Sequence, residues 1–280
     1  MKPNYATITA LHIYPVKSCR GISLTTAELT GRGLVHDREW MVVDAEGQFL
    51  TQRTLPRMAL IETAITSDSL RLRVQGQSDA LELSLADRDR PSCRVRVWQD
   101  DCAALDEGSA AADWLSACLG TAVRLVRFDP AHRRISERQW THGVDAENRF
   151  SDGYPLLVIG EESLEDLNSR LDVAMPMDRF RPNIVIRGLG PHGEDDAHVL
   201  RGDGFEIRLV KACVRCSVTT IAQTTGAMGK EPLRKLATYR RDPTLGGVTF
   251  GMNGIVTAHD DTPLTVGMRL NVGTAVILSK

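Results

Sequence analysis

The chain has 280 residues, of which 42% are hydrophobic and 25% are charged. This length allows two domains with a sizeable core, and the composition is ordinary for a soluble globular enzyme. The net charge of −2 gives no electrostatic reason to expect nucleic acid or an anionic membrane as a partner.

The N-terminus and the cysteines indicate a location. Residues 1–6 lead directly into a strand pattern, without the features of a signal peptide or a membrane anchor. Six scattered cysteines are too few for a secreted disulfide scaffold of this length. We therefore expect a cytoplasmic protein with reduced thiols.

The first hundred residues read almost entirely as strands. Residues 40–44 and 48–52 are predicted to pair across the turn 45–47. Hydrophobic residues also alternate with polar ones at Leu11 and Ile13, at Leu70, Leu72 and Val74, at Leu81, Leu83 and Leu85, and at Val95 and Val97. This period of two, repeated so often, favours an antiparallel barrel or sandwich with one wet face.

The period then changes to that of a helix. Residues 109–119 place apolar side chains on one stripe, with Ser109 as the N-cap and Gly120 as the stop. Residues 121–127 return to a strand, and the polar segment 129–149 is predicted to be a long surface loop. The remaining predicted elements are a helix marked by Leu164, Leu167 and Leu171, strands at 184–186, 205–210 and 275–278, and a short helix at 231–239.

A pair of cysteines, Cys213 and Cys216, ends the strand-like run 205–216. A β-type run, 217–221, follows, so Cys216 is expected on a short link between two strands. A zinc site needs a second close pair, which the other cysteines do not supply, and a redox dithiol usually begins a helix. Two small buried residues, or a metal–thiolate ligand, are the other interpretations. From these residues alone the structural interpretation is favoured.

Three other segments place cations and polar groups at strand ends. Residues 14–21 contain Lys17 and Ser18, and residues 36–40 contain Arg38, which either binds a phosphate with two donors or pairs with a neighbouring acid. In residues 180–184, Pro182 fixes the backbone, so Arg181 and Asn183 are expected to point to one side. Together these groups are what a site for a large, polar, phosphorylated cofactor requires.

Ordered blocks of this kind run along nearly the whole chain. They are residues 14–19, 37–38, 151–152, 168–171, 180–185, 213–216 with 219–220, and 230–233. In this order they resemble MOSC-domain molybdoenzymes with an N-terminal β-barrel partner domain, similar to the mitochondrial amidoxime-reducing component and bacterial YcbX-like proteins. The resemblance implies a mainly β fold with some α: a barrel domain at 1–105 and a MOSC domain, a barrel core with flanking helices, at 106–280. A single intertwined unit is the alternative.

The resemblance also implies roles for individual residues. Cys216, and not Cys213, would bind molybdenum, which shifts the interpretation of the pair from structure to ligand. Implied contacts to the molybdenum–pterin cofactor are Lys17, Ser18 and Arg38 at its phosphate end and Arg181, Asn183 and Arg215 along the pterin. Residues 151–154 match a further contact segment, in which Gly153 and Tyr154 replace a hydroxyl-bearing pair and leave backbone contacts. Val214 stands in place of a serine and Asn253 in place of a tyrosine.

The activity that the resemblance implies is reduction of a small N-hydroxylated or N-oxide substrate, as in detoxification of N-hydroxylated bases. Asp152 is the candidate for relaying a proton or ordering water, and a turn or cap carboxylate is an equal alternative. The chain stops at Lys280 without a C-x₄-C-x₂-C ferredoxin run, so electrons are expected from a separate ferredoxin, haem protein or flavin reductase. The arginines of 133–149 either dock that protein or form a solvated loop.

Three alternatives to a reductase stay open at this point. MOSC domains also end molybdenum-cofactor sulfurases, so a sulfur-transfer role is possible, although no pyridoxal-phosphate domain is attached. A protein that carries the cofactor without turnover is the second alternative. The third is a β protein stabilised by zinc or disulfides.

Overall fold

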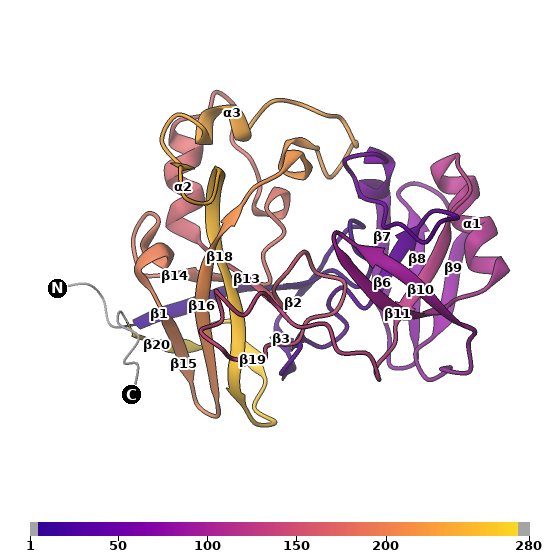
Figure 1. Cartoon of the computed structure of the whole chain (residues 1–280). Coiled ribbons are helices and arrows are strands. Elements are labelled where there is room, and N and C mark those ends of the chain that lie inside the picture. The colour runs from indigo at the N-terminus through magenta and orange to yellow at the C-terminus, as the bar shows by residue number, and fades with distance from the viewer. Residues whose placement is uncertain (1–4, 274–280) are drawn as a thin grey trace.

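The computed structural model describes residues 5–273, which form two lobes (Figure 1). One lobe is a closed seven-stranded barrel with α2 (Glu161–Ser169) and α3 (Leu233–Leu236) at one end. The other holds two smaller sheets and α1 (Ser109–Leu119). Strands predominate and only 15% of the chain is helical, which confirms the predicted fold class. Within this part of the chain, no helix has the length and apolarity needed to cross a bilayer.

The barrel is closed by a strand from the beginning of the chain. Its strands follow the order β13, β14, β1, β20, β15, β16 and β18, and β18 pairs again with β13. Their bounds are β1 Tyr5–Ile13, β13 Leu156–Gly160, β14 Ile184–Arg187, β15 Val199–Gly202, β16 Phe205–Val214, β18 Gly247–His259 and β20 Arg269–Gly273. Because β1 pairs antiparallel with both β14 and β20, it joins strands that come much later in the sequence.

Short strands accompany the barrel. β2 (Ile22–Leu24) pairs with β1 and β17 (Arg241–Asp242) with β18, while β3 (Thr26–Ala27) with β19 (Leu264–Thr265), and β4 (Leu29–Thr30) with β5 (Gly33–Leu34), form two separate two-stranded sheets. The predicted strand at 275–278 lies outside the described residues.

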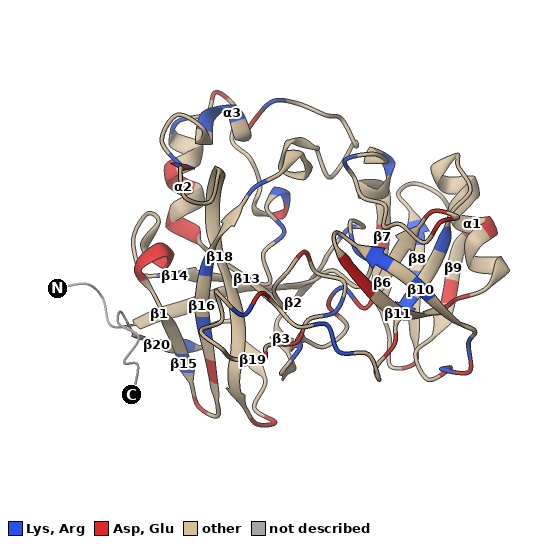
Figure 2. Cartoon of the chain, viewed as in Figure 1, with Lys and Arg blue, Asp and Glu red and all other residues tan. Residues whose placement is uncertain are grey.

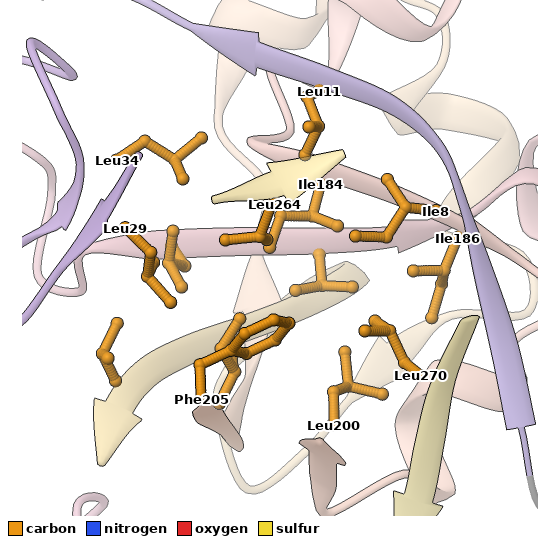
Figure 3. Close-up of a cluster of buried hydrophobic side chains, with 14 of the residues drawn as sticks. Ile8, Leu11, Leu29, Leu34, Ile184, Ile186, Leu200, Phe205, Leu264 and Leu270 are labelled. Atoms are coloured by element: carbon orange, nitrogen blue, oxygen red, sulfur yellow. The ribbon is translucent and has the colours of Figure 1, made fainter. Parts of the chain in front are cut away.

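Aliphatic side chains fill the interior of the barrel (Figure 3). In β1 the buried positions change phase, because Ile8 and Leu11 both face the core although they are three residues apart. The pairing of β1 with β14 shifts register between Ile8 and Ala10, and such a bulge rotates the following residues to the other face. The bulge thereby keeps both ends of the strand in the core.

The second lobe buries the leucines and valines that alternate in the sequence. Leu70 and Leu72 are fully buried, and the arginines between and after them are exposed. The sheets consist of β10 (Ser92–Val97), β11 (Asp100–Asp106), β12 (Arg124–Phe128) and β6 (Trp40–Val43), and of β7 (Ile61–Ile65), β8 (Ser69–Val74) and β9 (Ala80–Ser84). The predicted turn at 45–47 is present, since the Asp44 amide donates to the Gln48 carbonyl.

Several strands pair with elements from the far side of the predicted border at residue 105. β12 belongs to the sheet that contains β6, β1 belongs to the barrel, and β3 pairs with β19. The border itself stays a prediction, and these pairings are of the kind expected for an intertwined unit.

The predicted helices are present with adjusted limits. α1 spans the predicted residues and ends at Gly120, whose φ of 75° is the left-handed conformation that glycine adopts readily. Its N-cap is Gly108 and not Ser109, which is the first helical residue, and no side chain caps the helix. α3 is a single turn, shorter than predicted, because Pro232 precedes it and turn hydrogen bonds follow it. The 3₁₀ helices are η1 Pro56–Leu60, η2 Met177–Arg179, η3 Gly193–Asp196 and η4 Ser217–Thr220.

The segment after Cys216 is η4, so the prediction of a strand at 217–221 was wrong. The hydroxyls of Thr219 and Thr220 donate to carbonyls three residues back, at Cys216 and Ser217, with distances of 2.9 and 2.8 Å. Such side-chain bonds to the local backbone favour a turn over a strand. The threonines and the valine have high β-strand propensity, but the hydrogen bonds of the threonine hydroxyls stabilise the 3₁₀ helix instead.

A buried ion pair holds the second lobe together. The Arg127 Nε donates to the Glu107 Oε1 at 2.6 Å, and both side chains are almost completely buried. The Trp40 indole donates to the same oxygen at 2.7 Å, and Arg127 also donates to the carbonyls of residues 84, 85 and 87. The guanidinium thus connects the end of β9 to β12.

Replacing Glu107 with glutamine should lower the free energy of unfolding by about 3 kcal/mol, because the Arg127 charge stays buried without a counter-charge. Urea titration followed by circular dichroism measures this loss. Glu62→Gln is the matched control: Glu62 pairs with the more exposed Arg73 and should cost at most about 1 kcal/mol. Equal losses in the two variants would contradict the role given to the buried pair.

Candidate functional site

One pocket collects every residue that the sequence singled out for the site. It contains about 820 Å³ of empty space, part of it open to solvent. The predicted residues that line it are Lys17, Ser18, Arg38, Asp152, Gly153, Tyr154, Arg181, Asn183, Val214, Arg215, Cys216 and Asn253. Ser151, from the predicted contact segment 151–154, also lines the pocket, as do residues that the sequence did not predict as contacts: Thr51, Arg53, Leu156, Leu157, Phe180, Cys213 and Val218. The structure brings these residues together in one pocket, and their individual roles stay predictions.

Strand ends bring these residues together. β1 ends just before the segment with Lys17 and Ser18, and β16 ends at Val214 just before Cys216. Three non-glycine residues of the pocket have left-handed backbones, with φ of 66° at Ser18, 47° at Arg38 and 57° at Arg181. Such conformations are unfavourable for side-chain-bearing residues and often mark functional sites.

The left-handed Arg181 changes one argument made from the sequence. The expectation that Arg181 and Asn183 point to one side assumed an extended backbone through Pro182. The positive φ at Arg181 contradicts that assumption, although both residues do line the pocket. Asn183 is buried, accepts hydrogen bonds from Arg38 and the Leu157 amide, and donates to the His12 carbonyl. It therefore belongs to the frame of the pocket.

Arg38 uses most of its donors within the protein. Its Nη1 lies 2.7 and 2.6 Å from the two oxygens of Asp37 and 3.0 Å from Asn183 Oδ1, and its Nη2 donates to the Arg181 carbonyl. Pairing with a neighbouring acid was the alternative to phosphate binding, and the structure contains that pair. Arg38 thus adds positive charge to the pocket but has few donors left for a ligand.

The Tyr14 ring contacts two guanidinium groups. The Arg38 and Arg181 Cζ atoms are 4.3 and 4.2 Å from its centroid, and its hydroxyl donates to the Pro182 carbonyl. Burial lowers the pKa of Arg181 to about 10, so this side chain stays protonated at neutral pH. Within residues 5–273 Arg181 has no ion-pair partner, which leaves its charge available to a ligand.

Lys17 and Asp152 form an ion pair in the pocket wall. The Lys17 Nζ lies 2.7 Å from Asp152 Oδ1 and 2.7 Å from the Phe150 carbonyl, and the Trp98 indole donates to the same Asp152 oxygen at 3.1 Å. Burial opposes ionisation of Asp152, but Lys17 and Trp98 more than offset it and hold its pKa well below the ordinary value. Burial lowers the pKa of Lys17, and Asp152 counteracts part of that effect.

Arg134 fixes the segment that carries Asp152. This guanidinium is buried and donates to Asp100, to Asn148 and to the carbonyls of residues 149, 151 and 152. Residues 129–149 contain no helix or strand, as predicted, but Arg134 shows that they are more than a surface loop. The sequence offered no signal for this role, because a buried arginine looks like a solvated one in a polar run.

The exposed arginines of that loop are paired locally. Arg133 binds Glu147 at 2.7 Å and Arg138 binds Asp145 at 2.8 Å. Figure 2 shows basic and acidic residues interspersed over both lobes. This pairing favours a solvated loop over a docking face for an acidic electron donor.

The two cysteines of the 213–216 pair differ in their surroundings. The Cys213 Sγ accepts a hydrogen bond from Arg215 Nη1 at 3.0 Å, while burial raises the pKa of this thiol. In the described part of the chain the Cys216 Sγ has no hydrogen-bond partner, and Cys216 lines the pocket. Cys216 is therefore the thiol that is free to bind a soft metal.

The remaining predicted residues shape the wall. Gly153 has open space where a Cβ would lie, and Val214, 42% exposed, packs on Gly247. The Tyr154 hydroxyl and the Arg215 Nε are buried, and neither has a hydrogen-bond partner among residues 5–273. The Nη2 of Arg215 donates to the Phe180 carbonyl. Asn253 reaches the pocket from β18.

The donor set fits a molybdenum–pterin cofactor. Five cations, Lys17, Arg38, Arg53, Arg181 and Arg215, share the pocket with a single carboxylate, Asp152, so the site attracts a large anion. A free thiol at the same site suits a soft metal. All cysteines of the described part are unpaired, and no three His, Cys, Asp or Glu residues there are grouped as a metal site, so a zinc- or disulfide-stabilised protein finds no support.

Comparison with known proteins identifies both parts of the chain. Residues 5–122 match the family described as the MOSC N-terminal beta barrel domain, and residues 145–276 match the MOSC domain. Mitochondrial amidoxime-reducing component 1 of Mus musculus is 40% identical, over 84% of this chain and 71% of its own. The Homo sapiens protein of that name is 37% identical, over 85% and 73%. A molybdenum cofactor sulfurase of Oryza sativa subsp. japonica is 32% identical, over 96% of this chain but 35% of its own length. The chain therefore belongs to the MOSC-domain family that includes the mitochondrial amidoxime-reducing components.

Proposed function

We propose that the protein is an oxidoreductase that uses a molybdenum–pterin cofactor to reduce N-hydroxylated or N-oxide compounds. Hydroxylamines, amidoximes and N-hydroxylated base analogues are the substrate class, and a separate ferredoxin, haem protein or flavin reductase supplies the electrons. The observation that carries the proposal is a free thiol, Cys216, in a pocket lined by five cations. The names of the relatives that match most of the chain support the reaction type.

The pocket residues divide the work of holding the cofactor. Cys216 is the metal ligand, and Arg181, which has no ion-pair partner among residues 5–273, takes anionic groups together with Lys17 and Ser18. Arg38, Asn183 and Arg215 are held by internal hydrogen bonds and shape the wall along the pterin. When bound, the cofactor supplies the two-electron chemistry that the side chains lack.

The reaction needs two protons as well as two electrons, since a hydroxylamine and these four particles give an amine and water. Asp152 is ionised at neutral pH because Lys17 holds its pKa low, so it is a poor proton donor. Its carboxylate instead accepts a hydrogen bond and orients the N–OH group or a water. Of the two roles predicted for Asp152, ordering is therefore the one we propose.

Sulfur transfer and carriage of the cofactor are the competing functions. Similarity to the rice sulfurase over 96% of this chain favours sulfur transfer over carriage of the cofactor. Both would need the metal site but no turnover of N–O compounds, so metal content and turnover together separate the three. A cytoplasmic location stays a prediction.

Cys216→Ala should abolish molybdenum binding and reduction of benzamidoxime by an artificial electron donor, because the thiolate ligand is lost. The measurement is the molybdenum and zinc content of protein purified from a host that makes the cofactor, with turnover beside it. Cys118→Ala, which removes a half-buried thiol on α1, is the matched control and should keep both properties. Loss of metal in Cys213→Ala but not in Cys216→Ala would reverse the assignment, and metal without turnover in the parent would favour a carrier.

Asp152→Asn should lower kcat by roughly 10- to 100-fold, the usual cost of losing an orienting group near a metal. Because the Asp152 charge raises the pKa of Lys17 against burial, its removal lets that pKa fall further, and Lys17 loses its proton at a lower pH. Any alkaline limb of the pH–rate profile that reports Lys17 should therefore move to lower pH. Asp79→Asn is the control, since Asp79 also accepts from an indole, that of Trp114, outside the pocket. A profile displaced to higher pH would contradict this coupling.

A further inference from the structure

Arg53 is a pocket cation that neither the sequence nor the cofactor roles account for. It lines the pocket, and no carboxylate of residues 5–273 forms an ion pair with it. Its charge nevertheless acts on the site: burial raises the pKa of Asp152, and Arg53 adds to the larger effects of Lys17 and Trp98 that lower it. A cation without a partner in a pocket wall is available to a ligand.

The guanidinium of Arg53 is held in place by aromatic rings. Its Cζ lies 4.4 Å from the Trp98 ring centroid and 5.7 Å from that of Phe49, and its Nε donates to the Thr51 hydroxyl at 3.2 Å. Phe49 and Trp98 contact each other, with centroids 5.1 Å apart. Stacking of this kind restrains a flat, weakly hydrated cation without neutralising it.

Trp98 is itself fixed although it is exposed. It has a left-handed φ of 57° in the turn between β10 and β11, and its side chain is 42% exposed. Its indole donates to Asp152 Oδ1, the oxygen that also binds Lys17. The second lobe thus contributes a rigid aromatic–guanidinium stack that is joined by a hydrogen bond to the acid of the site.

We propose that Arg53, with Trp98 and Phe49 behind it, is the substrate subsite that selects flat, conjugated N-hydroxylated compounds that are neutral or anionic. This inference rests on the proposed function and adds the class of substrate. A planar ring system stacks on a guanidinium or an indole, while an aliphatic hydroxylamine has no π face to offer. The unpaired charge of Arg53 disfavours amidinium-like cations in the same place.

The test compares two amidoximes, one of which carries a phenyl ring where the other carries a methyl group. Equilibrium dissociation constants of benzamidoxime and acetamidoxime are measured by calorimetry on the oxidised, cofactor-loaded protein without an electron donor. Arg53→Met should weaken benzamidoxime binding by about tenfold, the loss of one stacking contact, and acetamidoxime binding by far less. Arg53→Lys keeps the charge but removes the planar group, so it should lose most of the preference for benzamidoxime over acetamidoxime. Trp98→Leu should lose most of this preference as well.

Trp114→Leu is the matched control, because the Trp114 indole also donates to an aspartate, at 3.0 Å, but lies outside the pocket. It should leave both constants unchanged. Equal weakening of both ligands in Arg53→Met, or no weakening, overturns the subsite while the proposed function stands. Loss of molybdenum from Arg53→Met also overturns it, since Arg53 would then hold the cofactor. A parent that binds and reduces neither amidoxime overturns the subsite and the proposed function together.

Discussion

The insertion of β1 between β14 and β20 is the constraint on which the rest of the structure depends. This pairing closes the barrel, and it fixes the position of the residues that follow β1. Tyr14 follows directly, and its ring contacts the guanidinium groups of both Arg38 and Arg181. Lys17 comes three residues later and forms an ion pair with Asp152 in the pocket wall. Without the closed barrel, these cations would have no common site.

Some cations of the pocket are bonded within the protein, and others are available to a ligand. Arg38 donates to Asp37 and Asn183, and Lys17 donates to Asp152 and to the Phe150 carbonyl. Buried charges that are paired in this way stabilise a single geometry, since breaking one pair leaves the other charge exposed to a low dielectric. Arg53 and Arg181, by contrast, are held by aromatic rings rather than by acids. The pocket is thereby rigid and still attractive to an anion.

Much of the fold and the site could be predicted from the sequence, for two different reasons. Alternating leucines such as Leu70 and Leu72 locate strands because burial has the same period as the pleat. Residues such as Cys216 and Arg181 were found through motif order, and no local pattern distinguishes them from structural residues. Arg53, Trp98 and Arg134 were missed because their importance comes from contacts between segments far apart in the chain. At 217–221 hydroxyl groups overrode β-type composition, which a residue count does not reveal.

The pairing of Tyr5 with Asn271 also has a consequence for biosynthesis. β1 leaves the ribosome long before β20 does, so β1 must wait for its second neighbour. Closing so long a segment is entropically costly and slow, and the edge of β1 stays open to wrong partners meanwhile. The walls of the pocket are complete only after that closure. A ligand that needs the complete pocket can therefore bind only after that closure, and until then the edge of β1 stays unpaired.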